Sequence, residues 1–253
     1  MRKSEHPQEL AQYACNAMMV VGLGRRIIHS DPAPSGHQEH GPLSKPEQIA
    51  RLRISLEDIV PAIFRQVEVP LTATLKALHD VIQAAFGWEG YHLHLFDVGD
   101  DRYGVPDPEW DSVRPIRSEK TMRLAILVAR GIKRFGYTYD LGDDWRHEVV
   151  VEPVGAADPA AAYPRFVAGS RRAPPEDVGG VPGYEEFVQA ITRPRHREHK
   201  AMLTWHGGPY DPDDIAEAEI AAALGKLARR RKLGRAAYLK SVGRRSCDQG
   251  RAW

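Results

Sequence analysis

Cysteine is scarce in this chain of 253 residues. The two cysteines, Cys15 and Cys247, stand near opposite ends of the sequence. Two distant thiols exclude a disulfide framework, and they cannot build a zinc cluster by themselves. This cysteine usage is typical of a protein that works in a reducing cytoplasm.

Long hydrophobic runs are also absent. The longest apolar stretch, Ala14 to Leu23, is interrupted by Asn16 and Gly22, and a membrane-spanning helix needs about 20 apolar residues. Glu5 and Glu9 precede it, and no small-x-small cleavage site follows, so it does not have the pattern of a signal peptide. We therefore expect no membrane segment and a cytoplasmic location.

The chain has little net charge, +1 in total, but the charge is unevenly distributed. From Lys226 onward there are ten basic residues and one acidic residue, Asp248. Such a segment is typical of a basic arm that binds nucleic acid, and also of a soluble tail. If the tail binds DNA, we expect the contacts to come from Arg229, Arg230, Arg231, Lys232 and Arg235.

Familiar catalytic signatures are missing: there is no Walker loop, no G-x-G-x-x-G after a strand, no G-x-S-x-G elbow and no H-E-x-x-H. What is present is a globular composition, with 42% hydrophobic and 27% charged residues. The chain is long enough to bury a sizeable core.

Three regions differ in composition. Residues 1–46 form a leader, and its part from 29 to 46, rich in Pro, Gly, Ser and His, is predicted to be a flexible linker. The segment before the linker is either a short helix or lies upstream of a true start at Met18 or Met19. Residues 47–228 are predicted to be one compact domain, and 229–253 a basic tail.

Strands and helices of the domain follow from hydrophobic periodicity. Residues 51–56 and 63–69 alternate as half-buried strands, and residues 75–86 carry apolar side chains at helical spacing, with Thr72 or Thr74 as N-cap and Gly87 after the end. Further strands are predicted at 91–98, 102–105, 133–140, 145–152 and 165–168, and further helices at 118–129, at 184–191 and from 211 onward. Strands joined mainly by hairpins predict an α+β fold, a mainly antiparallel sheet with helices packed on one side.

Four stretches give the chain a family resemblance. They read Pro61-Ala-Ile-Phe-Arg65; Leu78-His79 continuing to Gly87-Trp88-x-x-x-His92-Leu-His94-x-Phe96; Tyr137-x-Tyr139-Asp140-x-Gly142-Asp143-Asp144-Trp145-x-His147; and Pro174-Pro175-Glu176-Asp177-x-Gly179-Gly180-x-x-Gly183-Tyr184. With Trp205 and Tyr210-Asp211-Pro212, these resemble the plasmid (Ri-plasmid) ORF-three-like family, also known as TnpR-type passenger proteins of insertion elements. The resemblance implies an accessory protein carried by mobile elements.

The TnpR label suggests a resolvase, which the residues do not support. No Tyr-x-Arg-x-Ser entry with a nucleophilic serine is present. Val178 stands where the family often has a cysteine, so a thiolate nucleophile or thiolate metal ligand in that loop is excluded.

Three histidines are candidate metal ligands. His92 and His94 are two residues apart in a predicted strand, so both rings should share one face, about 7 Å apart at the backbone. His147 shares a face with Trp145 on another strand. Together, His92, His94 and His147 would suit a divalent metal such as zinc, manganese or iron. The alternative is that His92 and His94 are a hydrogen-bonded interior pair or part of a polar face at a sheet edge, and that His147 is a packed histidine bonded to a backbone carbonyl or to Asp144.

Carboxylates complete a candidate cleft. Asp140 and Asp144 flank the predicted hairpin turn, and Glu176 and Asp177 stand on a stiff Pro-Pro/Gly-Gly loop that we expect to pack against this hairpin. The Asp residues have a second interpretation, since Gly and Asp favour turns. The full candidate set is His92, His94, Asp140, Asp144, Trp145, His147, Glu176, Asp177 and Tyr184.

Two functions follow from these residues. The first is a non-catalytic or weakly catalytic accessory protein that binds a ligand or nucleic acid. The second is a metal-dependent hydrolase or nuclease that uses the His/Asp/Glu cleft. A divalent metal is the cofactor and DNA the macromolecular partner that the sequence suggests; it indicates neither a substrate nor an oligomeric state.

Overall fold

The computed structural model describes residues 46–106 and 115–249, with side chains up to residue 240. The predictions for the leader, including the choice between a short helix and a later start, lie outside the described residues. Within the described ranges, no helix has both the length and the apolar character needed to cross a membrane.

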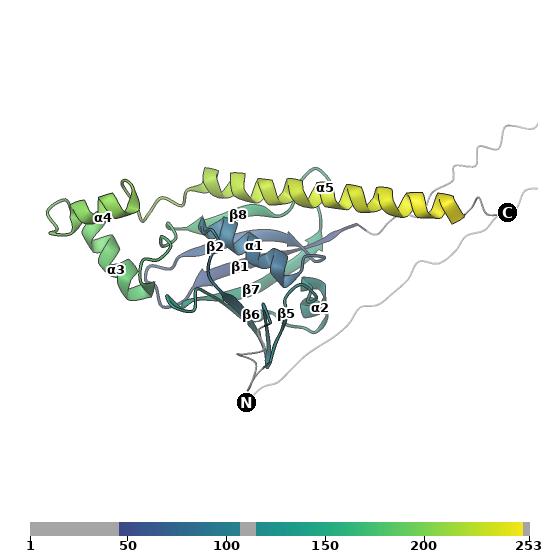
Figure 1. The fold of residues 1–253 in the computed structure, drawn as a ribbon, viewed down its shortest axis with the longest axis horizontal. Coiled ribbons are helices and arrows are strands. Elements are labelled where there is room, and N and C mark those ends of the chain that lie inside the picture. Colours follow the sequence, from purple (N-terminus) through teal and green to yellow (C-terminus); the bar gives the residue numbers. More distant parts are fainter. Residues whose placement is uncertain (1–45, 107–114, 250–253) are drawn as a thin grey trace, which may run out of the picture. The chain divides into compact units, whose positions relative to one another are not determined.

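An eight-stranded sheet forms the centre of the described chain (Figure 1). Its strands run in the order β5-β4-β3-β6-β7-β1-β2-β8, and each neighbouring pair is antiparallel except β4 and β5. This confirms the predicted α+β class. The strands are β1 (Gln48–Leu56), β2 (Phe64–Pro70), β3 (His94–Val98), β4 (Asp101–Gly104), β5 (Ile116–Ser118), β6 (Arg134–Tyr139), β7 (Trp145–Ala156) and β8 (Arg165–Ser170).

Helix α1 (Leu75–Phe86) connects β2 to β3 and lies against the sheet (Figure 1). The Thr74 side chain accepts a hydrogen bond from the Ala77 N–H, and Gly87 ends the helix with φ 74°. Both caps follow from residue chemistry, because a threonine oxygen satisfies a free N–H and glycine adopts the left-handed conformation without strain. The predicted helix is confirmed at both ends.

One hydrophobic core unites the sheet with the helices. Leu52 and Ile54 of β1, Leu78 of α1, Phe187 and Leu224 belong to the same buried cluster. The remaining helices are α2 (Leu124–Ala129), α3 (Gly180–Ile191), α4 (His199–His206) and α5 (Glu217–Gln249).

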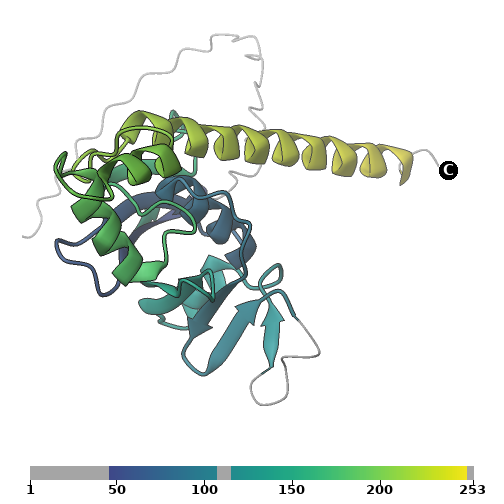
Figure 2. The ribbon, with the colours of Figure 1, turned by 60° about the vertical axis from the view of Figure 1, so that its left-hand side comes forward.

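Helix α5 differs from the prediction at both ends. It begins at Glu217 rather than at Asp211, because the Asp211 and Asp214 side chains accept hydrogen bonds from N–H groups two residues on and so form turns. It then continues to Gln249 through most of the segment predicted as a separate tail from 229 onward (Figures 1 and 2). Ala, Leu, Arg and Lys dominate that segment, and all four are strong helix formers.

Candidate metal centre

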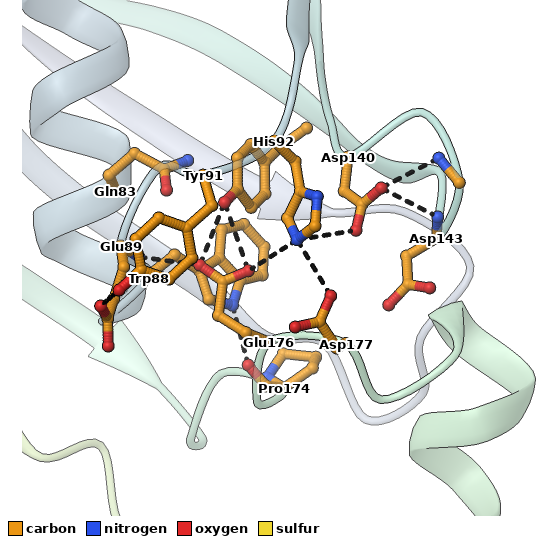
Figure 3. A network of polar contacts seen from close by, with 12 residues as sticks. Gln83, Trp88, Glu89, Tyr91, His92, Asp140, Asp143, Pro174, Glu176 and Asp177 are labelled. Carbon is orange, nitrogen blue, oxygen red and sulfur yellow. Dashed lines mark hydrogen bonds and ion pairs between the residues drawn. The ribbon is translucent and has the colours of Figure 1, made fainter.

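Three segments that are distant in sequence meet beside the end of β6 (Figure 3). His92 lies in the bend just before β3, Asp140 directly follows β6, and Glu176 and Asp177 belong to the loop before α3. One imidazole and three carboxylates thus face one another.

The Nε2 atom of His92 lies among these carboxylates. It is 2.9 Å from Asp177 Oδ1, 3.5 Å from Asp140 Oδ2 and 4.0 Å from Glu176 Oε2. Nε2 is itself buried, yet it forms no aligned hydrogen bond with any described residue. The short Asp177 distance is therefore a close approach without hydrogen-bond geometry. The ring nitrogen points between the carboxylates, as it would toward a shared partner (Figure 3).

The turn after β6 orients Asp140. Its Oδ1 accepts hydrogen bonds from the backbone N–H groups of Gly142, at 2.9 Å, and Asp143, at 3.3 Å. An aspartate tolerates the φ of 53° found here because its side chain bonds the following backbone. With Oδ1 occupied in this way, Oδ2 is the oxygen that faces His92.

Glu176 is held by two donors. Its Oε1 accepts a hydrogen bond from the Glu89 N–H at 2.7 Å and from the Tyr139 hydroxyl at 3.0 Å. Burial, and then the neighbouring Glu176 charge, raise the pKa of Tyr139 well above its ordinary value. The phenol therefore keeps its proton and remains a hydrogen-bond donor.

The loop that carries Glu176 and Asp177 is fastened on two sides. The Trp88 indole N–H donates to the Pro174 carbonyl at 2.8 Å, and the Gly179 N–H donates to Asp143 Oδ2 at 3.1 Å. Together with the bond from Tyr139 to Glu176, these contacts join the loop to the β6–β7 hairpin. The predicted contact between loop and hairpin is present.

His94 lies in a different cluster. Its Nε2 is 2.6 Å from Glu119 Oε2, and its ring stacks on that of His79 with centroids 3.6 Å apart. Glu119 is buried and its second oxygen has no hydrogen-bond partner among the described residues. His94 thus belongs to an interior polar cluster between α1 and β3.

His147 is an interior residue as well. Its Nδ1 lies 2.9 Å from the Trp145 carbonyl oxygen, and burial lowers the pKa of His147 to about 4. The prediction that His92, His94 and His147 share one metal is therefore wrong. His94 and His147 lie on strands and point into the core, whereas His92 precedes β3, where the chain bends.

Three other predicted cleft residues lie elsewhere. Asp144 is exposed and pairs with Arg146 at 3.3 Å, Trp145 is buried in the core, and the Tyr184 hydroxyl bonds that of Tyr210 at 3.0 Å. Residues outside the predicted set contribute instead, namely Asp143, Glu89 and Tyr139. Tyr139 had a signal, since it directly precedes Asp140 and alternates with Tyr137.

The donor set fits a metal ion. Single ligand atoms of His92, Asp140 and Asp177 lie within 4.8 Å of one another. Bonds of about 2.1 Å would draw such atoms to roughly 3.4 Å, which a small side-chain rotation achieves. One imidazole nitrogen with carboxylate oxygens suits zinc, manganese or iron.

A cavity of about 520 Å³ adjoins this cluster. Asp177 forms part of its wall, together with apolar side chains of α3 and α4, including Phe187, Met202 and Trp205, and with polar residues that include Arg197 and Glu198. Because Asp177 itself is exposed, a bound ion would be accessible to a small molecule in this cavity.

Fold and site together define an α+β domain with a histidine–carboxylate cluster at one end of a mainly antiparallel sheet. The family model of the plasmid pRiA4b ORF-3-like proteins matches residues 48–219, the region that carries both features. The chain therefore belongs to the plasmid pRiA4b ORF-3-like protein family.

Two relatives illustrate this membership. "Uncharacterized protein y4hQ" of Sinorhizobium fredii (strain NBRC 101917 / NGR234) is 36% identical over 181 residues, which are 71% of this chain and 92% of that protein. The crystal structure of "Protein of Unknown Function MM3350" from Methanosarcina mazei Go1 is 35% identical, with a TM-score of 0.62. That comparison covers 68% of this chain and 96% of the other.

Proposed function

We propose that the protein binds a divalent metal ion through His92, Asp140 and Asp177 and uses it for hydrolysis. The observation that carries this proposal is the buried Nε2 of His92, which is surrounded by carboxylates but aligned with none of them. A buried polar atom without a partner costs free energy, and a shared cation would satisfy it.

Each neighbouring group supports a hydrolytic role. A divalent ion held by these residues would supply a water of lowered pKa and would polarise the bond to be cleaved. Glu176, whose Oε2 is 4.0 Å from His92 Nε2, stands where it can accept a proton from such a water. The Tyr139 hydroxyl and the Glu89 N–H hold that carboxylate in place, as a general base requires.

Metal titration tests the proposal directly. Purified protein, stripped with a chelator, is titrated with Zn²⁺ and Mn²⁺ by calorimetry. We expect one site, and at least about tenfold weaker binding for His92→Ala and Asp177→Asn. Asp144→Asn is the matched control, since Asp144 is an acid of the same turn that pairs with Arg146 instead. Unchanged affinity in His92→Ala, or no binding at all, would refute the proposal.

The second candidate function is DNA binding along α5. Arg229, Lys232 and Lys240 are exposed on this helix, whereas Arg231 and Arg235 are partly neutralised by Glu47. Deletion of residues 236–253 together with Arg229→Gln and Lys232→Gln should weaken binding to a DNA duplex and reduce its salt dependence. Phosphate contacts weaken strongly between 50 and 200 mM salt. If the variant and the unmodified protein bind DNA equally over this range, this function is contradicted.

Cellular context is part of the proposal. The plasmid name of the family supports carriage by a mobile element, as a passenger gene, and the cysteine usage supports a cytoplasmic location. Mapping of the flanking DNA for insertion-element ends tests the first, and cell fractionation tests the second.

A further inference from the structure

Arg65 is an unusual residue of strand β2 because its charged side chain is buried. Only 1% of the residue is exposed. Its Nε donates to the Ala85 carbonyl at 2.9 Å, and its Nη1 donates to the carbonyls of Phe64, at 2.8 Å, and Ser170, at 3.1 Å. The guanidinium thus joins β2, the end of α1 and β8.

These carbonyls stabilise the buried Arg65 charge in part. Ala85 lies in the last turn of α1, where unpaired carbonyl oxygens and the helix dipole favour a cation. Carbonyl dipoles, however, do not cancel a full positive charge. Among the described residues no carboxylate lies within ion-pair distance of Arg65. Burial accordingly lowers the pKa of Arg65 to about 10.

A cavity of about 370 Å³ opens in front of this cation. Its polar wall includes Arg172, His206 and Tyr210 besides Arg65, and its one lining carboxylate among the described residues is the exposed Glu219. Arg172 is paired with the exposed Asp214 at 3.1 Å, so Arg65 is the buried charge of this wall that has no carboxylate partner among the described residues. A buried, unpaired charge is costly, and an anion is the partner that offsets it.

The rest of the wall is apolar. Phe86 at the end of α1, Pro174, and Ile220 and Ala223 of α5 form this part of the lining. A volume of this size with an apolar wall and a few convergent polar groups is typical of a small-molecule site.

We propose that this cavity binds a small organic anion, a carboxylate or phosphate monoester with a short apolar body. The anionic group contacts Arg65 and Arg172, and the apolar body lies against Phe86, Ile220 and Ala223. Nε and Nη1 of Arg65 already bind carbonyl oxygens, so Nη2 of Arg65 and the guanidinium of Arg172 are the donors for the oxygens of either anion.

This site is separate from the metal centre. Pro174 and Pro175 line the cavity, whereas the next two residues of the same loop, Glu176 and Asp177, face His92. The loop is thus a wall between the two sites, and each can be tested without the other.

The test measures anion binding to the full chain. Melting temperatures are recorded in chloride buffer at constant ionic strength, with butyrate and benzoate as carboxylate probes and with inorganic phosphate and methyl phosphate as phosphate probes. We expect at least one probe to raise the melting temperature saturably, by about 3 °C or more, with calorimetry giving one site. The arm that responds identifies the anion class.

Two variants of α5 separate the cavity from general salt effects. Ala223→Phe places a ring in the cavity and should abolish the response, whereas Ala222→Phe places the same ring at an exposed neighbouring position and should retain it. Arg172→Gln should weaken binding at least tenfold. Asp177→Asn, in the metal centre, should leave anion binding unchanged.

Two results would overturn the proposal. One is that no probe raises the melting temperature above that in chloride. The other is that the response persists in Ala223→Phe. Arg65→Met is informative if it folds; if it does not fold, the α5 variants still decide.

Discussion

Gly180 and Asp143 are in such close contact that a side chain at position 180 would clash with the Asp143 backbone. A Cβ on Gly180 would lie 2.5 Å from the Asp143 carbonyl oxygen, and the φ of Gly180 is +65°. Here the backbone of the loop carrying Glu176 and Asp177 meets the backbone of the β6–β7 turn carrying Asp140. We expect this contact to set the distance between the two halves of the proposed metal centre.

Gly180→Ala should therefore separate the loop from the turn. We expect a loss of stability of about 2 kcal/mol or more, from the clash and the left-handed backbone, and at least tenfold weaker metal binding. Urea unfolding and metal calorimetry measure the two effects. Gly207→Ala is the control, because Gly207 also has a positive φ, +81°, but has open space around it; it should lower stability without changing metal affinity. Equal metal affinity in both variants would show that the contact does not position the centre.

Trp88→Phe should loosen the same loop from its other side. The substitution removes the indole N–H that donates to the Pro174 carbonyl but keeps a ring stacked between Phe86 and Tyr139. A buried carbonyl that loses its donor costs about 1–3 kcal/mol. Chemical denaturation should show that loss, and faster proteolysis within residues 174–180 should accompany it. Normal stability would mean that Pro174 does not depend on the indole N–H.

His147 should make the protein less stable in mild acid. Burial lowers the pKa of His147 to about 4 in the folded state, against about 6.5 for an unfolded histidine. Below pH 6.5 the unfolded chain therefore binds a proton at His147 that the folded chain does not bind. The free energy of unfolding consequently decreases as the pH falls toward 4. The slope is about 1 kcal/mol per pH unit for one such group, and His79, whose pKa burial lowers to about 3, acts in the same direction.

Urea unfolding between pH 7 and 5 measures this slope and stays above the range in which carboxylates titrate. His147→Gln should reduce it by about 1 kcal/mol per pH unit. An unaltered slope in His147→Gln would show that His147 is not the group responsible.

Glu68 should stabilise the outer strands of the sheet. Its carboxylate, almost fully buried, accepts hydrogen bonds from Arg51 at 2.7 Å and Arg165 at 2.5 Å. Although burial alone would raise the pKa of Glu68, the two arginines outweigh it and the pKa is lowered. Glu68→Gln should cost about 1–3 kcal/mol, with both arginines half-exposed and partly solvated. Because the pKa is lowered, the stabilisation by Glu68 is present above pH 4.5 and is lost in stronger acid. Unfolding of the unmodified protein and of Glu68→Gln at several pH values measures this loss.

Local chemistry made much of the fold predictable. The alternation of Leu52, Ile54 and Leu56 marked β1, and Thr74 and Gly87 marked both ends of α1, because each of these signals acts within a few residues. The predicted helix at 118–129 is confirmed at 124–129, but its first half is wrong for a long-range reason. Residues 116–118 pair with β4, and the Glu119 side chain is buried against His94, so the helix cannot begin before Leu124.

The sequence predicted which segments form the candidate site, but not which of their side chains face one another. Period-two geometry assigned His92 and His94 to one site, but only His94 lies in β3, and His92 faces the loop before α3 instead. Asp140 and Asp144 looked equivalent in sequence. Tertiary contacts distinguish them, because Asp140 faces His92 while Asp144 pairs with Arg146.

During translation, β1 leaves the ribosome long before the chain can complete its surroundings. β1 lies inside the sheet between β2 and β7, so the β1–β2 hairpin can form early, but its other edge stays open until residues 145–156 have been made. Such non-local pairing slows folding and exposes an unpaired strand edge to other chains. Arrested nascent chains that end before Trp145 should therefore be cleaved readily by protease, whereas chains extended well beyond Ala156 should resist it.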